Sequence, residues 1–202
     1  GIMLRLSVLC FLVISYLLIY MHTSTAEQVK LDIKEHRLEN GLRLLIHQDH
    51  SSPIISFQVW YNVGSINERP GITGISHLFE HMMFKGSKNV DPEEHSRIIQ
   101  RNGGTDNAFT TEDMTAYFEN LPSSQIELAV KLEADRMAHL RLTAETLASE
   151  RQVVKEERRM RVDNSLFGKL NEGLYSATFL AHPYRWPVIG WMSDIDAITL
   201  DD

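Results

Sequence analysis

The sequence predicts an α+β domain whose mixed or antiparallel sheet has helices packed on one face. Segments with strand signals come in two groups, and helix-like segments follow each group. With 202 residues, the chain is long enough for one compact domain with a core. Its hydrophobic fraction of 43% and charged fraction of 23% are typical of globular proteins. We find no internal repeat or low-complexity linker that would divide it.

The first group of strands is predicted from a turn signal and a β-branched run. Asn40-Gly41 is a strong two-residue turn signal, and it joins the segments 35–40 and 41–48 into a predicted hairpin. Residues 54–63 (IISFQVWYNV) are β-branched and aromatic, so we expect a buried strand. A polar loop with Gly and Pro is expected from 64 to 74.

The remaining elements follow from periodicity and capping signals. Residues 75–84 are expected to form a helix, and 92–101 a second one, with Asp91 as N-cap and Pro92 at the first helical position. Asn102-Gly103-Gly104 should end that helix. The other expected elements are strands at 105–111 and 114–121, helices at 123–140, 143–162 and 167–179, and a loop from 181 onward.

Residues 1–26 have the pattern of a secretory signal peptide. Arg5 precedes the apolar run 6–20 (LSVLCFLVISYLLIY), and small residues follow at 24–26. The alternative is a membrane anchor, but the run is shorter than the ~20 residues that span a bilayer. We therefore expect secretion across the inner membrane to the periplasm, with membrane contact only through an uncleaved N-terminal segment. The mature domain would be 27–202.

Composition excludes several classes of function. The formal charge of -7, without an uninterrupted basic cluster, argues against nucleic acid as a partner. Cys10 is the single cysteine and lies inside the apolar run. A mature chain would then have no disulfide, no cysteine-based zinc site and no thiol nucleophile.

The stretch that carries chemical information is His77-Leu78-Phe79-Glu80-His81. Two histidines four residues apart project about 40° apart on one helix face, so both imidazoles can bind one cation. Imidazole nitrogen suits zinc, and a catalytic zinc needs one further protein ligand and an open position. The sequence therefore predicts a metal site with a third ligand elsewhere.

A chance pair of histidines on a solvated helix face is the simpler interpretation of such spacing. Here the neighbouring residues are apolar, and two histidines with a glutamate would be costly to bury without a metal or partner. The order His-x-x-Glu-His is also a known inverse of the metallopeptidase motif His-Glu-x-x-His. Metal binding is the interpretation that we retain.

Four segments together resemble the pitrilysin/insulinase family of inverted-motif zinc peptidases, most closely its shorter bacterial and mitochondrial-processing-peptidase-like branch. The resemblance covers roughly residues 35–195 and includes a turn-and-helix block, a strand block, an acidic helix block and a late loop. In order, they are 74–86 (GISHLFEHMMFKG), 103–110 (GGTDNAFT), 150–157 (ERQVVKEE) and 182–190 (HPYRWPVIG). Their order and spacing make the match specific.

The resemblance implies that Glu157 is the third zinc ligand, with Glu156 as its rival because adjacent helical residues point about 100° apart. Glu150 lies on the same helix face as Glu157, about 10 Å along the axis. By resemblance, Glu150 supports the site without binding the ion. The strand residues Asn107 and Ala108 would pair with substrate backbone as an edge strand.

The function implied is a zinc-dependent endopeptidase with one Zn²⁺ per domain, acting on peptides or small unfolded proteins. Glu80, which is not needed as a ligand, would be the general base on the water at zinc. A non-catalytic structural or binding subunit of the same fold is the alternative. A different zinc hydrolase that shares only the local motif is a second alternative, less compatible with the downstream blocks.

The family pairs this domain with further domains of similar fold. Residues 27–202 would then be the N-terminal zinc peptidase domain of a truncated protein, inactive without its companion. We expect a peptide substrate and a second homologous domain or subunit as partners. The remaining histidines have no ligand partner at helical spacing and are interpreted as surface or core residues: His36, His47, His50, His95, His139 and His182.

Overall fold

The computed structural model describes residues 31–202. The predicted signal peptide, residues 1–26, and Cys10 lie outside the described residues. The described chain consists of two compact units, which divide between Ser51 and Ser52. In the described part, no helix combines the length and apolar character needed to cross a membrane.

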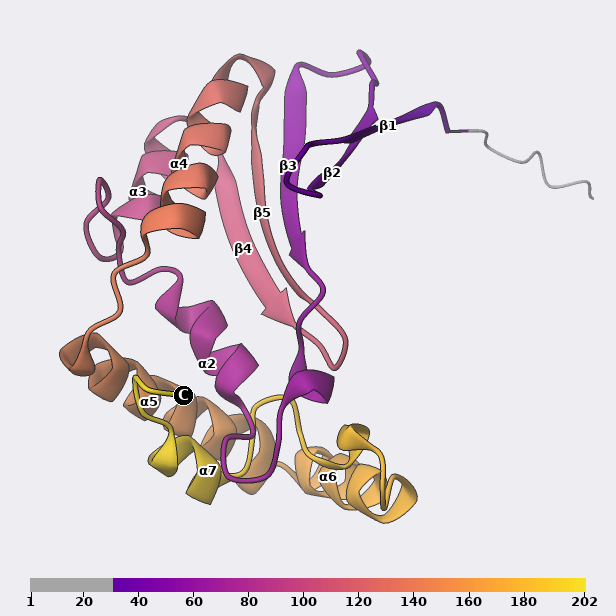
Figure 1. Ribbon diagram of the computed structural model, residues 1–202, viewed down its shortest axis with the longest axis vertical. Helices are drawn as coiled ribbons and strands as arrows, with labels where there is room; N and C mark the ends of the chain where they lie inside the picture. The colour runs from indigo at the N-terminus through magenta and orange to yellow at the C-terminus, as the bar shows by residue number, and fades with distance from the viewer. Residues whose placement is uncertain (1–30) are drawn as a thin grey trace, which may run out of the picture. The chain divides into compact units, whose positions relative to one another are not determined.

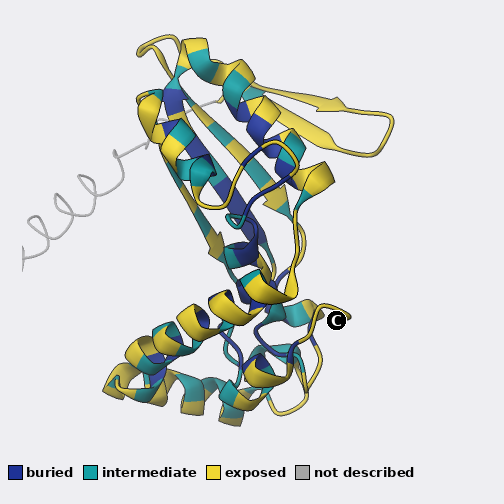
Figure 2. Ribbon diagram, turned by 90° about the vertical axis from the view of Figure 1, so that its left-hand side faces the viewer, coloured by how far each residue is buried: buried dark blue, intermediate teal, exposed yellow. Residues whose placement is uncertain are grey.

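The first unit contains the hairpin predicted from the Asn40-Gly41 signal. β1 (Ile33–Arg37) pairs antiparallel with β2 (Arg43–His47). Gly41 has a φ of 90°, a conformation that glycine adopts at no steric cost. The Asn40 side-chain oxygen accepts the backbone N–H of Leu42 at 3.1 Å. The two strands are almost wholly exposed, as their yellow colour in Figure 2 shows.

The second unit is built on a three-stranded antiparallel sheet in the order β3-β5-β4 (Figure 1). The strands are β3 (Ile54–Tyr61), β4 (Thr105–Thr110) and β5 (Thr115–Pro122). Residues along β3 and β4 alternate between exposed and half-buried, because helices cover one face only. The predicted α+β class is therefore confirmed, but the expectation that residues 54–63 form a buried strand is wrong for the open face.

Six helices complete the second unit. α3 (Glu94–Arg101) and α4 (Ile126–His139) pack on the covered face of the sheet. α2 (Ile75–Met82) lies against β4 and against α5 (Ala144–Arg158). α6 (Leu166–Thr178) and α7 (Met192–Ala197) follow.

The hydrophobic core of this unit consists of two clusters. The first joins α2, α5 and α7 and contains Leu78, Met82, Val154, Ile195 and Ile198. The second joins the sheet, α3 and α4 and contains Ile99, Leu121, Ala129 and Leu132.

α5 begins where the sequence predicts. The Thr143 hydroxyl oxygen accepts a hydrogen bond from the Thr146 backbone N–H at 3.1 Å. In return, the Thr146 hydroxyl oxygen accepts one from the Thr143 backbone N–H at 3.2 Å. This capping box satisfies two N–H groups that helix geometry leaves free. After Arg158 the helix widens into a π-turn over Arg159–Asp163.

Two helix predictions need correction. The helix expected from Pro92, capped by Asp91, begins at Glu94 instead, because the backbone N–H of Glu93 bonds to the Phe84 carbonyl at 3.1 Å and holds a turn there. Residues 192–197, expected to be loop, form α7. α7 is too short to show helical periodicity, and the fully buried Ile195 anchors it in the core.

Candidate metal centre

α2 carries His77, Glu80 and His81, and its start is tightly fixed. Gly74 has a φ of 87°, and a Cβ there would lie 2.4 Å from the Ile189 carbonyl oxygen. The buried Glu68 carboxylate accepts the N–H groups of Gly74 at 2.8 Å and Ser76 at 2.9 Å. These contacts satisfy donors at the helix N-terminus and fix the direction in which α2 leaves the loop.

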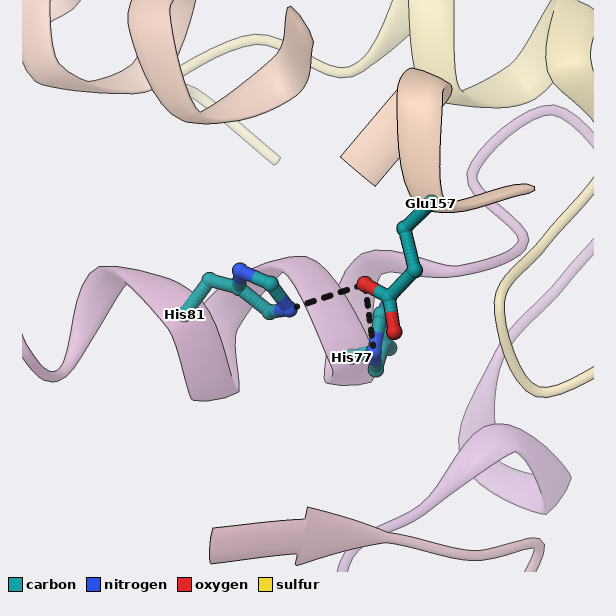
Figure 3. A group of neighbouring side chains, drawn as sticks. All are labelled: His77, His81 and Glu157. Carbon is teal, nitrogen blue, oxygen red and sulfur yellow. Dashed lines mark ion pairs between the residues drawn. The ribbon is translucent and has the colours of Figure 1, made fainter. Parts of the chain in front are cut away.

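Three side chains converge between α2 and α5 (Figure 3). Glu157 Oε2 lies 3.3 Å from His81 Nε2 and 3.7 Å from His77 Nε2. The three candidate ligand atoms all lie within 4.8 Å of one another. The structure thus brings together the two histidines of the motif and the glutamate that the family resemblance indicates.

The geometry and chemistry of these three groups fit zinc. Ligand atoms at about 2.0–2.1 Å from a tetrahedral zinc lie about 3.3–3.4 Å apart, close to the 3.3 Å and 3.7 Å distances found here. Burial lowers the pKa of His77 to about 4, which keeps its imidazole neutral and able to bind a cation. Two imidazoles and one carboxylate, without a thiolate, are a typical donor set for a catalytic zinc.

Glu157, and not Glu156, faces the imidazoles. Glu156 is exposed and forms an ion pair with Arg159. The second oxygen of Glu157, Oε1, lies 3.0 Å from Arg161 Nη2, which leaves Oε2 for the histidine side. The hydrogen bond with His81 lowers the pKa of the Glu157 carboxyl, so it is ionised.

Glu150 lies behind His81. Its Oε1 is 3.0 Å from His81 Nδ1, and its Oε2 is 2.6 Å from Lys85 Nζ. Burial lowers the pKa of His81, but hydrogen bonds to Glu150 and Glu157 outweigh burial and raise this pKa to about 9, so without a metal its imidazole is protonated on both nitrogens. A metal bound at Nε2 would displace that proton, while Nδ1–H would still donate to Glu150. The sequence did not single out Lys85, although it follows His81 by four residues.

Glu80 does not belong to the converging group. Its Oε2 accepts the hydroxyl of Thr110, on β4, at 2.5 Å. Burial raises the pKa of the Glu80 carboxyl, although the Thr110 hydrogen bond opposes this shift. Thr110 is a site residue that sequence reasoning missed, although it ends the quoted GGTDNAFT block. The arrangement places the Glu80 carboxylate beside the three candidate ligands, with one of its oxygens bonded to Thr110.

Asn107 and Ala108 lie on β4, the strand at one edge of the three-stranded sheet. The Asn107 side-chain oxygen accepts the Ala108 backbone N–H at 2.9 Å. Among residues 31–202, no strand pairs with the other edge of β4. The structure does not place these two residues among the converging ligands, but it places their strand against α2.

A second group of possible ligands is fully buried between α3, β5 and α4. It consists of His95, Glu119 and Glu133. The Arg136 guanidinium hydrogen-bonds to both Glu133 oxygens and lies 3.5 Å from Glu119 Oε1. Because Arg136 already occupies oxygens of both carboxylates and brings a fixed positive charge into the group, the group does not suit a metal ion. His95, interpreted from the sequence as surface or core, is a core residue.

An apolar pocket of about 390 Å³ lies between α2, α4 and the sheet. Tyr61, Phe79, Met83, Tyr117 and Met137 form much of its wall. None of the three converging side chains lines this pocket. The candidate metal centre therefore lies outside this pocket.

The free energy of unfolding should fall between about pH 6.5 and 8 because of Glu133. Burial and the neighbouring Glu119 raise the pKa of Glu133 from 4.5 to about 8, so the folded chain keeps a proton that the unfolded chain has lost. His95 has the opposite effect below pH 6.5. Burial lowers its pKa from 6.5 to about 4, so between these values the unfolded chain binds a proton that the folded chain does not, and the free energy of unfolding rises with pH. Arg136 and Asp106 are the other charged groups near His95.

Urea unfolding at pH 6.5 and pH 8 measures this contribution. The decrease in unfolding free energy should be larger for the unsubstituted chain than for Glu133→Gln, which cannot titrate. Groups that do not contact Glu133 titrate alike in both proteins, so their contributions cancel in the comparison. Equal decreases would show that Glu133 is already ionised at pH 6.5.

The chain is similar in sequence and in fold to known peptidases. The family model described as Insulinase (Peptidase family M16) matches residues 43–190. The protein named zinc protease PqqE from Helicobacter pylori is 40% identical over 166 residues, which cover 82% of this chain and 37% of that protein. A crystal structure of a protease from Helicobacter pylori superposes with a TM-score of 0.84 at 38% identity, covering 85% of this chain and 42% of that one.

A more distant structure shares the fold. It is a peptidase M16 inactive domain from Pseudomonas fluorescens, with a TM-score of 0.77 at 18% identity, covering 85% of this chain and 42% of that chain. The chain spans about two fifths of the length of each of these three proteins. The family model covers most of the chain, including the whole of α2 and Glu157. The chain therefore belongs to the insulinase family of peptidases, peptidase family M16.

Proposed function

We propose that this chain is the zinc-binding domain of a metalloendopeptidase that hydrolyses peptides or small unfolded proteins. The observation that carries the proposal is the convergence of His77, His81 and Glu157 from two helices. Glu80 lies beside these three side chains but is not one of the candidate ligands, and it hydrogen-bonds to Thr110 instead. Membership of a family whose relatives are named zinc proteases supports it.

His77, His81 and Glu157 would hold one Zn²⁺. Bound there, the ion would polarise the scissile carbonyl and lower the pKa of a water molecule. Glu150 fixes the ring orientation of His81 through the 3.0 Å contact with Nδ1. The helical backbone of α2 keeps the two imidazoles on one face of the helix, and the packing of α2 on α5 keeps them close to Glu157.

Glu80 is the proposed general base. Its carboxylate takes a proton from the attacking water and returns it to the leaving amine. The Thr110 hydroxyl holds one carboxylate oxygen in place. Burial raises the pKa of Glu80, which makes it a stronger base than an exposed glutamate.

Substrate binding would use the edge of β4. An extended peptide can add to a free sheet edge through main-chain hydrogen bonds, which do not depend on side-chain identity. Asn107 and Ala108 are the positions proposed for this pairing. Such binding would allow peptides of varied sequence to reach Glu80 and the metal ligands.

Replacing either histidine with alanine should remove the metal. His77→Ala and His81→Ala should each weaken zinc binding by more than about a hundredfold, the upper range for residues that only support a ligand. Competition with a chromophoric chelator measures the zinc Kd. His139→Ala is the control, because His139 is half-exposed on α4 and outside the group. Unchanged zinc affinity in both variants would overturn the proposed site.

A non-catalytic structural or binding subunit is the alternative function. The match to the Pseudomonas fluorescens domain described as inactive shows that this fold also occurs in such a domain. The presence of His77, Glu80, His81 and Glu157 favours the enzyme. Zinc content and hydrolysis of a quenched peptide decide between the two, measured on the chain alone and with a homologous companion domain added. Zinc binding without hydrolysis in both would support the alternative.

Export to the periplasm remains a prediction from residues 1–26. Fractionation of cells that express the chain tests it. A cytoplasmic, full-length product would contradict the signal-peptide interpretation, whereas a membrane-bound full-length product would favour an anchor.

A further inference from the structure

A line of charged contacts runs outward from His81. His81 Nδ1 lies 3.0 Å from Glu150 Oε1, and Glu150 Oε2 lies 2.6 Å from Lys85 Nζ. Lys85 Nζ also donates to Glu93 Oε1 at 2.5 Å. Four side chains from three segments are therefore joined end to end, from an imidazole of the proposed zinc site to the surface.

Glu150 needs the lysine because its side chain is only 5% exposed. A buried carboxylate is unfavourable unless charges or hydrogen bonds compensate it. Lys85 is the one Lys or Arg in the described chain that lies within ion-pair distance of Glu150. Without Lys85, nothing would hold Oε2, and the carboxylate could rotate away from the His81 ring.

Glu93 reaches Lys85 through an unusual backbone conformation. Its φ is 63°, and it is the one described residue other than glycine with a positive φ. A glutamate in this left-handed region is unfavourable, and such strain persists where the surroundings fix it. Here the Glu93 N–H bonds to the Phe84 carbonyl at 3.1 Å, which sets the Glu93 carboxylate against the neighbouring Lys85.

We propose that Lys85, held by Glu93, is a positioning residue of the metal site. Lys85 fixes Glu150, and Glu150 fixes the His81 ring so that Nε2 points toward the metal. The inference rests on the proposed zinc site and adds two residues to it, one of them strained. Lys85 itself touches neither the ion nor the substrate.

The test compares zinc affinities, which do not depend on turnover. Lys85→Met keeps most of the side-chain length and removes the charge, and should weaken zinc binding about tenfold. Lys85→Arg restores the cation and should bind within about twofold of the unsubstituted chain. Glu93→Gln removes the outer carboxylate and should weaken binding by only about threefold, because its ion pair with Lys85 lies at the surface. Lys88→Met is the matched control, because Lys88 is exposed and outside the line of contacts.

A second readout reports directly on His81. In the zinc-loaded chain, the ¹⁵N shift of His81 Nδ1 should change in Lys85→Met and return in Lys85→Arg, whereas a lysine that only stabilised the fold would not move it. The melting temperature of each metal-free variant shows whether it folds. If Lys85→Met does not fold, Glu93→Gln carries the test.

The outcomes separate this inference from the proposed function. If the unsubstituted chain binds no zinc, the zinc site itself is wrong and this inference falls with it. If that chain binds zinc and both Lys85→Met and Glu93→Gln match its Kd and ¹⁵N shift, the zinc site stands and the positioning role is wrong. Weakened binding in both variants, with rescue by arginine, supports it.

Discussion

Glu80→Gln is expected to keep bound zinc and to lower kcat by about 10²–10⁴-fold, the range that a general acid–base group contributes. Glutamine has the same shape and can still pair with the Thr110 hydroxyl that holds Glu80 now. It cannot accept a proton from water. The proposed ligands His77, His81 and Glu157 are unchanged, so zinc content should stay near one equivalent per chain.

Zinc analysis and hydrolysis of a quenched peptide, both on the same preparation, measure this effect. Glu156→Gln is the matched control, because Glu156 carries the same charge next to the proposed ligand but is exposed and paired with Arg159. It should change neither zinc content nor kcat. Undiminished turnover in Glu80→Gln would mean that another group is the base, and loss of zinc would mean that Glu80 helps to bind it.

Local sequence signals predicted much of the fold. Asn40-Gly41 predicted the β1–β2 hairpin because the turn needs a positive φ that Gly41 adopts. Thr143 predicted the start of α5 because its hydroxyl caps the helix. These features depend on a few adjacent residues, so no tertiary information is needed to find them. The histidine pair on α2 was predictable for the same reason.

Features that depend on contacts between distant segments were not predictable from local signals. The periodicity of α5 left Glu156 and Glu157 as rivals. The family resemblance favoured Glu157, and the packing of α5 on α2 sets Glu157 against the imidazoles. The start of α3 moved because the Phe84 carbonyl, nine residues before Glu93 in the sequence, accepts the Glu93 N–H. No local sequence signal encodes either contact.

The buried group around Arg136 shows the same limit. His95, Glu119, Glu133 and Arg136 come from α3, β5 and α4, and each looks like an ordinary surface residue in the sequence. Only Glu133 and Arg136, three residues apart on α4, have a spacing that suggests a pair. The structure buries all four, with exposed fractions of 1–4%.

Arg136→Met should lower the free energy of unfolding by about 3–5 kcal/mol at pH 8, the cost of leaving buried charges without their partner. The variant loses the hydrogen bonds to Glu133 and the ion pair with Glu119. It also loses the placement of the guanidinium over the Tyr117 ring, 4.4 Å from the centroid. Methionine fills much of the space, so the loss should come mainly from the uncompensated carboxylates.

The pH dependence of this loss identifies its cause. Burial already raises the pKa of Glu133, and without Arg136 both carboxyls should bind protons more readily. The destabilisation should therefore be smaller at pH 6 than at pH 8. Lys131→Met, which breaks an exposed pair with Glu127 on the same helix, should cost less than about 1 kcal/mol at either pH. A loss in Arg136→Met that does not change with pH would point to packing, and not charge, as the role of this arginine.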